Sequence, residues 1–115
     1  MSKKIKVFTL ALAVMMVISS IAFAYANMYE KYSTVDLRRG HGTGHQSSST
    51  AWLRPYIANV QEDINNAGKG ISCGTADGKF GSNTEKGVKK YQVAVGLKGD
   101  GIVGDKTKTA LWQGW

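Results

Sequence analysis

An eight-residue pattern occurs twice in this chain and constrains its fold more than any other feature of the sequence. Residues 77–84 read DGKFGSNT and residues 100–107 read DGIVGDKT, so both fit D-G-x-[FV]-G-x-x-T. Asp-Gly favours a tight turn, because glycine accepts a positive φ and aspartate can hydrogen-bond its own backbone. The apolar fourth residue, Phe80 or Val103, is then expected to enter the core. The repeat therefore predicts two helices that begin with the same local geometry.

Hydrophobic periodicity predicts a further helix before the two repeats. Its apolar residues recur at helical spacing and form one stripe: Leu53, Ile57, Val60 and Ile64. Pro55 suits the first turn of this helix, and Gly68 suits its end. The pattern predicts a helix from about Pro55 to Ala67.

Polar residues after each repeat indicate where the other two helices begin. Ser82 and Glu85 have the spacing of a capping box, so the second helix is predicted to start there and to end at Gly96. Asp105 is a favourable N-cap for a third helix. Gly87, inside the second helix, is expected to weaken it by ~1 kcal/mol relative to alanine. The sequence thus predicts an all-α fold, a small three-helix bundle over residues 51–115.

The first 26 residues have the layout of a secretory signal peptide. A basic start (Lys3, Lys4 and Lys6) precedes an uncharged apolar run, and small residues near its end suit signal peptidase, with cleavage after Ala26 favoured over Ala24. Residues 7–26 are also long enough for a retained membrane anchor. Cleavage is the preferred prediction, because Ser19 and Ser20 weaken the run and no basic cluster follows it. We expect a secreted or cell-wall-associated protein, bound to a membrane only if the signal is not cleaved.

Residues 27–50 are predicted to form a flexible linker, because they contain many Gly, Ser and Thr residues and few apolar ones after Leu37. His41 and His45 lie within it at H-x-x-x-H spacing. Their neighbouring glycines oppose a helix, and a zinc site needs more ligands than these two residues. We therefore expect no metal site and no cofactor.

The charge and the cysteine count limit the partners and the source of stability. Loss of the three signal-peptide lysines leaves 12 basic residues against 8 acidic ones, a net charge of +4. Such a chain is attracted to anionic envelope polymers, whereas dispersed charge and export argue against nucleic acid. Cys73 is the single cysteine, so no internal disulfide forms. We expect it to be a small buried residue, with an intermolecular disulfide or a reactive thiol as the alternatives.

Over residues 55–112 the chain resembles the peptidoglycan-binding domain of bacterial cell-wall hydrolases, a three-helix module. The resemblance rests on Val60-Gln61, Tyr91-Gln92 and Gly96-Leu97 around the two repeats. The repeat residues that match the family motif are Asp77, Gly78, Phe80, Gly81, Thr84, Asp100, Gly101, Val103, Gly104 and Thr107. Three positions depart from it: Gly87 replaces the usual Ala, Tyr91 the commoner Phe, and Lys108 a frequent Trp.

The resemblance implies non-catalytic binding of bacterial peptidoglycan. Aromatic faces can stack on sugar rings, and amides, carboxylates and ammonium groups can bind hydroxyl, acetamido and carboxylate groups. The candidate ligand-binding residues are Tyr91, Gln92, Lys98, Asp100 and Trp112. Four of them have a structural alternative: Tyr91 in the core, Gln92 as a cap for backbone groups, Asp100 in a turn and Trp112 as a half-buried lid.

Two other functions remain open from the sequence. The protein could recruit a separate cell-wall hydrolase or another envelope protein through Trp52, Trp112 or Trp115. It could also be a small lytic enzyme, but Glu62 and Asp63 are adjacent on a helix and point about 100° apart, unlike a glycosidase pair across a cleft. No catalytic residues are therefore expected.

Overall fold

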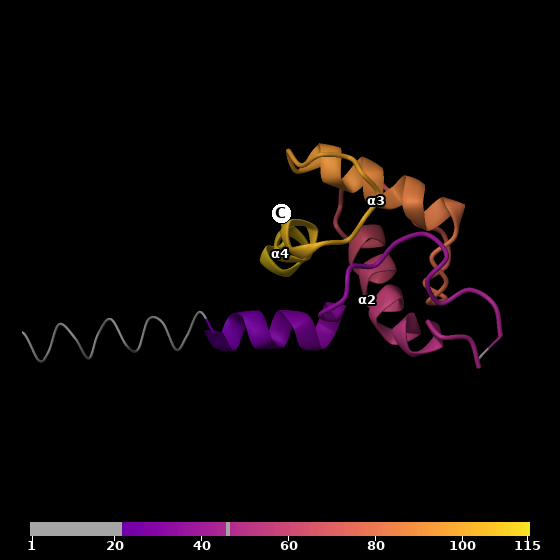
Figure 1. Ribbon diagram of the computed structural model, residues 1–115. Coiled ribbons are helices and arrows are strands. Elements are labelled where there is room, and N and C mark those ends of the chain that lie inside the picture. Colours follow the sequence, from indigo (N-terminus) through magenta and orange to yellow (C-terminus); the bar gives the residue numbers. More distant parts are fainter. Residues whose placement is uncertain (1–21, 46) are drawn as a thin grey trace, which may run out of the picture.

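The computed structural model describes residues 22–45 and 47–115, and their regular structure is helical (Figure 1). A short 3-10 helix, η1 (Ala51–Leu53), leads into α2 (Arg54–Asn65), followed by α3 (Ser82–Ala94) and α4 (Asp105–Gln113). Residues 22–32 form a further helical segment. The three predicted helices are confirmed, and each predicted bound lies within two residues of the observed one. The predicted signal peptide lies mostly outside the described residues, and its cleavage stays a prediction.

The core lies where α2 meets α3 and α4. The apolar stripe of α2 is fully buried there, together with the motif residues Phe80 and Val103. Among the described residues, the core comprises Met28, Tyr32, Leu37, Leu53, Ile57, Val60, Ile64, Cys73, Phe80, Val88, Tyr91, Val103, Ala110 and Leu111. Three of these residues, Met28, Tyr32 and Leu37, precede the predicted domain. The core is therefore larger than a three-helix module would supply.

The predicted N-caps are wrong in detail. Gly81 and Gly104 occupy the N-cap positions with extended backbones, and neither helix has a side-chain cap. Ser82 and Asp105 are the first helical residues instead, so the capping box with Glu85 does not form. Glycine is among the residues that commonly occupy N-cap positions.

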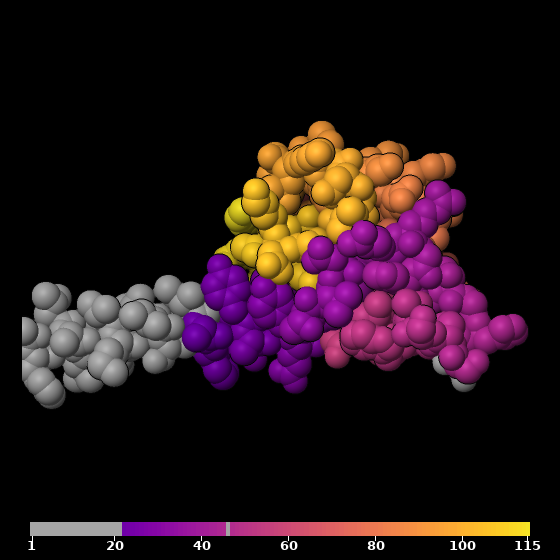
Figure 2. Space-filling model, viewed as in Figure 1, coloured from indigo at the N-terminus to yellow at the C-terminus, as the bar shows by residue number. Residues whose placement is uncertain are grey.

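The segment predicted to be a flexible linker packs on the helical domain instead. Leu37 and Val103 form an antiparallel bridge, with N–O distances of 3.2 and 2.8 Å. The Gly40 amide donates to Phe80 O, and the Phe80 amide donates to His41 O, both at 2.9 Å. The apolar residues of both repeats thus share backbone hydrogen bonds with one segment. Figure 2 shows this segment, in purple, as a continuous band over the domain.

Side chains hold both ends of this segment. Tyr29 donates to Asp105 Oδ1 at 3.0 Å, and Tyr32 meets the Trp112 ring edge-on, with centroids 6.4 Å apart. At the other end, the Arg54 guanidinium donates to the carbonyls of Gly42 and Gly44 at 2.8 and 2.7 Å. This packing could not be predicted from composition, because most hydrogen bonds of the segment use backbone atoms of its polar and glycine residues.

Lys108 is fully buried beneath the N-terminal segment. Its Nζ donates to Val35 O at 2.9 Å and lies 5.6 Å from the Tyr29 ring centroid. Burial lowers the pKa of its amine, an effect that Asp36 and Asp105 oppose. Because it is covered, this position offers no exposed platform for a sugar.

Gly87 in α3 packs against Cys73 in the loop before the first repeat. A Cβ on Gly87 would lie 2.5 Å from Cys73 Sγ and 3.0 Å from Ser72 O. Glycine in α3 therefore lets the loop before the first repeat approach the helix backbone. Cys73 is buried, as predicted, and its burial raises the pKa of the thiol to about 11.

Candidate functional site

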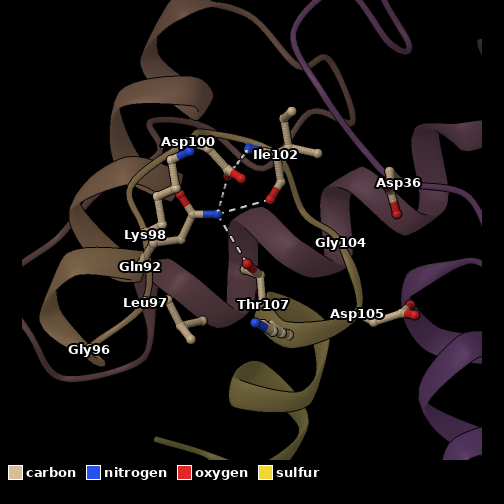
Figure 3. Close-up of a pocket in the computed structure, with 11 residues that line it drawn as sticks. Asp36, Gln92, Gly96, Leu97, Lys98, Asp100, Ile102, Gly104, Asp105 and Thr107 are labelled. Atoms are coloured by element: carbon tan, nitrogen blue, oxygen red, sulfur yellow. Dashed lines mark hydrogen bonds between the residues drawn. The ribbon is translucent and has the colours of Figure 1, made fainter.

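A cavity of about 510 Å³, here called the second-turn cavity, lies beside the second repeat (Figure 3). The end of α3 and the loop after it supply Gln92, Leu97 and Lys98, and the repeat supplies Asp100 and its neighbours. Its full lining is Asp36, Gln92, Gly96, Leu97, Lys98, Asp100, Ile102, Gly104, Asp105, Lys106 and Thr107.

Gln92 holds the turn that forms the cavity. Its Nε2 donates to Asp100 Oδ1 at 2.9 Å, Ile102 O at 2.9 Å and Thr107 Oγ1 at 3.0 Å. Its Oε1 accepts from the Gly101 amide at 2.9 Å. Figure 3 shows its amide among these groups. The side chain is 1 % exposed, so Gln92 positions the turn and has its donors and its amide oxygen already engaged.

Asp100 is exposed at the cavity and keeps its negative charge. The Ile102 amide donates to Asp100 Oδ1 at 2.9 Å, and this bond, with the one from Gln92, lowers the pKa of the carboxyl. A carboxyl group held ionised accepts hydrogen bonds and does not serve as a proton donor near neutral pH. The arrangement thus suits binding of hydroxyl or amide groups.

Lysines and further carboxylates give the cavity both signs of charge. Lys98 and Lys106 are exposed lining residues, and Asp105 lies at the start of α4. Asp36 reaches the same cavity from the N-terminal segment, opposite Gln92 in Figure 3. With the Leu97 side chain as an apolar surface, the cavity can contact carboxylates, hydroxyls and the apolar faces of one ligand.

A related cavity of about 420 Å³, the first-turn cavity, lies beside the first repeat. It includes Asp77, Lys79, Gly81, Ser82, Asn83 and Thr84, the residues at the same repeat positions as Asp100, Ile102, Gly104, Asp105, Lys106 and Thr107. It has fewer charged side chains, in part because Ser82 and Asn83 replace Asp105 and Lys106. The two repeats thus build similar shapes with different chemistry.

The structure brings only three of the five candidate ligand residues together. Gln92, Lys98 and Asp100 line the second-turn cavity. Tyr91 is buried in another cavity, and Trp112 lies beside Tyr25 and Met28 of the N-terminal helix. Asp36, Asp105 and Lys106 were not among the candidates. Asp105 and Lys106 could have been found from the second repeat, but nothing in the sequence placed Asp36 there.

Histidines and acidic residues do not gather into a metal centre in the part of the chain that the structure describes. His41 accepts a hydrogen bond from the Arg38 amide at 3.3 Å through Nδ1, and burial lowers the pKa of its ring. Within residues 22–45 and 47–115, no helix is both long enough and apolar enough to cross a bilayer.

Comparison with known families identifies the folded region. The family model of the peptidoglycan binding domain matches residues 54–111. This chain belongs to the peptidoglycan binding domain family. The match includes α2, α3, both repeats and most of α4, whereas the N-terminal helix and the segment that contains Asp36 precede it. Comparisons with curated proteins and with solved structures found no match.

Membership in the peptidoglycan binding domain family agrees with the resemblance predicted from the repeats. The lining of the second-turn cavity comes partly from the matched region and partly from the segment before it. The family domain supplies the turn, the lysines and Asp100, and the preceding segment adds Asp36.

Proposed function

We propose that this protein is exported and binds bacterial peptidoglycan without cleaving it, through the second-turn cavity. The observation that supports this proposal most directly is a family domain whose second repeat holds exposed charges of both signs around a rigid turn. Peptidoglycan presents hydroxyl, acetamido and carboxylate groups along one polymer. Lys98 and Lys106 can pair with its carboxylates, while Asp100 accepts from hydroxyl or amide groups.

Co-sedimentation with insoluble peptidoglycan stripped of teichoic acid tests the proposal. The protein from Asn27 onward is mixed with the polymer at low and at roughly physiological salt, where charges are screened over ~8 Å. Retention at both salts, with no sugar or peptide released, is the expected result. Release of fragments would instead indicate lytic activity.

Two double variants distinguish binding at the second-turn cavity from general electrostatic attraction to the polymer. Lys98→Ala with Lys106→Ala should weaken retention by roughly 2- to 30-fold, the effect of losing two exposed ion pairs. Lys86→Ala with Lys90→Ala removes the same charge from exposed positions that do not line the cavity, and should retain nearly full binding. Equal losses in both variants would contradict a specific role for the cavity.

Recruitment of a separate cell-wall hydrolase is the second candidate function. Trp52 is 56 % exposed and stands edge-on to Tyr56, with ring centroids 6.2 Å apart. A rigid exposed aromatic residue of this kind suits a protein contact. Absence of retention on peptidoglycan would favour this function.

A further inference from the structure

A third cavity, here called the Tyr91 cavity, measures about 300 Å³ and belongs to neither repeat turn. Lys31 comes from the N-terminal helix and Asp63 from α2, while Tyr91 comes from α3 and Leu111 from α4. Trp115 lines it just after α4. Residues far apart in the sequence thus converge on one small space.

The Tyr91 hydroxyl is buried and has no hydrogen-bond partner among the described residues. Other buried polar side chains that line the core, such as Gln61 and Gln92, have several partners. A buried hydroxyl without a partner typically costs about 1–3 kcal/mol of stability, and phenylalanine would avoid this cost. The hydroxyl therefore has unused hydrogen-bonding capacity beside the cavity that Tyr91 lines.

Asp63 supplies an acceptor in the same cavity. Its Oδ2 accepts from the Tyr32 hydroxyl and lies 2.8 Å from Lys31 Nζ. These contacts fix the carboxylate, and no hydrogen bond within the described residues uses Oδ1. Asp63 and Tyr91 line the same cavity, where burial first and the negative charge of Asp63 second raise the pKa of Tyr91.

The remaining walls are mostly aromatic and aliphatic, with the Asn66 amide as a further polar group. The Trp115 side chain is 49 % exposed, and Ala67 and Leu111 line the same cavity. Besides Lys31 and the Asn66 amide, the cavity therefore offers one hydroxyl donor, one carboxylate acceptor, a small apolar surface and an indole side chain. An acetamido group needs these partners: a donor for its carbonyl, an acceptor for its N–H and an apolar surface for its methyl group.

We propose that the Tyr91 cavity binds the acetamido group of an N-acetylated amino sugar. The Tyr91 hydroxyl donates to the acetamido carbonyl, Asp63 accepts from the N–H, and the methyl group packs on Ala67 and Leu111. The sugar ring stacks on Trp115. This assignment rests on the proposed binding of peptidoglycan and places a sugar subsite away from the second-turn cavity.

Titration with a soluble tetramer of N-acetylglucosamine tests this assignment, with the deacetylated tetramer as the comparison. Binding is followed by Trp fluorescence and by amide shifts in NMR spectra. The expected result is binding of the acetylated tetramer only, with shifts at Tyr91, Leu111 and Trp115. Equal binding of both tetramers, or shifts confined to the second-turn cavity, would overturn the assignment.

Tyr91→Phe removes only the hydroxyl and should leave the protein folded and at least as stable. Loss of one hydrogen bond should weaken binding of the acetylated tetramer about fivefold or more. Tyr56→Phe makes the same chemical change at a residue that does not line the cavity, and should bind like the parent protein. Unchanged affinity of Tyr91→Phe would overturn the role of the hydroxyl.

Sedimentation with whole peptidoglycan distinguishes failure of the Tyr91 assignment from failure of the proposed function. If the parent protein sediments with peptidoglycan but does not bind the acetylated tetramer, the Tyr91 assignment fails and wall binding stands. If it binds neither, both fail.

Discussion

Gln61 and Gln92 make the same four hydrogen bonds in the two halves of the domain. Gln61 Nε2 donates to Asp77 Oδ1, Lys79 O and Thr84 Oγ1 at 3.3, 3.0 and 2.8 Å, and Oε1 accepts from the Gly78 amide at 2.9 Å. Gln92 makes the matching bonds to the second repeat. Each glutamine therefore ties one helix to the start of the next.

Replacement of either glutamine by alanine should destabilise the fold. Each change leaves a buried glycine amide and a buried threonine hydroxyl without their glutamine partner, so we expect a loss of about 2–4 kcal/mol. Urea unfolding followed by circular dichroism measures it. Gln113→Ala, at an exposed position, is the control and should change stability by less than about 0.5 kcal/mol. A small effect at Gln61 or Gln92 would show that water replaces the amide.

Gly87→Ala should destabilise the protein, although alanine favours helices by ~1 kcal/mol. The new methyl group would overlap Cys73 Sγ, so we expect a net loss of about 1–3 kcal/mol. Cys73→Ala in the same chain removes the closest overlap and should recover part of the loss. A double-mutant cycle from thermal unfolding measures this coupling, and strict additivity would contradict it.

Leu37→Ala should destabilise the domain by about 2–4 kcal/mol, because Leu37 is fully buried in the shared core. Val35→Ala, two residues earlier and 39 % exposed, is the matched control and should have a much smaller effect. Chemical denaturation distinguishes the two variants. Equal stability of Leu37→Ala and the parent protein would restore the interpretation of this segment as a loose linker.

The thiol of Cys73 should make stability depend on pH at the alkaline end. Its pKa is about 11 in the folded protein, above the ordinary value of 9.0, because the thiol is buried. The folded state therefore holds this proton more tightly, and its contribution to stability is complete below pH 9.0 and is lost as pH rises towards about 11. Denaturation of the parent protein and Cys73→Ala between these pH values should show the steeper decline in the parent. Parallel curves would contradict the raised pKa.

The repeats predicted the positions of the helices and of Phe80 and Val103, because turn chemistry and apolar periodicity are local signals. The roles of Gln61 and Gln92 could be predicted only in part, because each glutamine bonds a turn that is distant in sequence. Asp36 could not be placed at all. Its position depends on the backbone pairing of Leu37 with Val103, which leaves no side-chain pattern in the sequence.

That pairing also sets the order in which this fold can be completed. Leu37 can pair only after Val103 has been synthesised, and the partners of Tyr29 and Met28 lie 76 and 81 residues later in the chain. Contacts of such long range form late, after the entropy of closing the intervening chain has been lost. The helical segment of residues 22–32 is thus among the last of the described elements to pack, and the native core closes only after residues 103–109 have been synthesised.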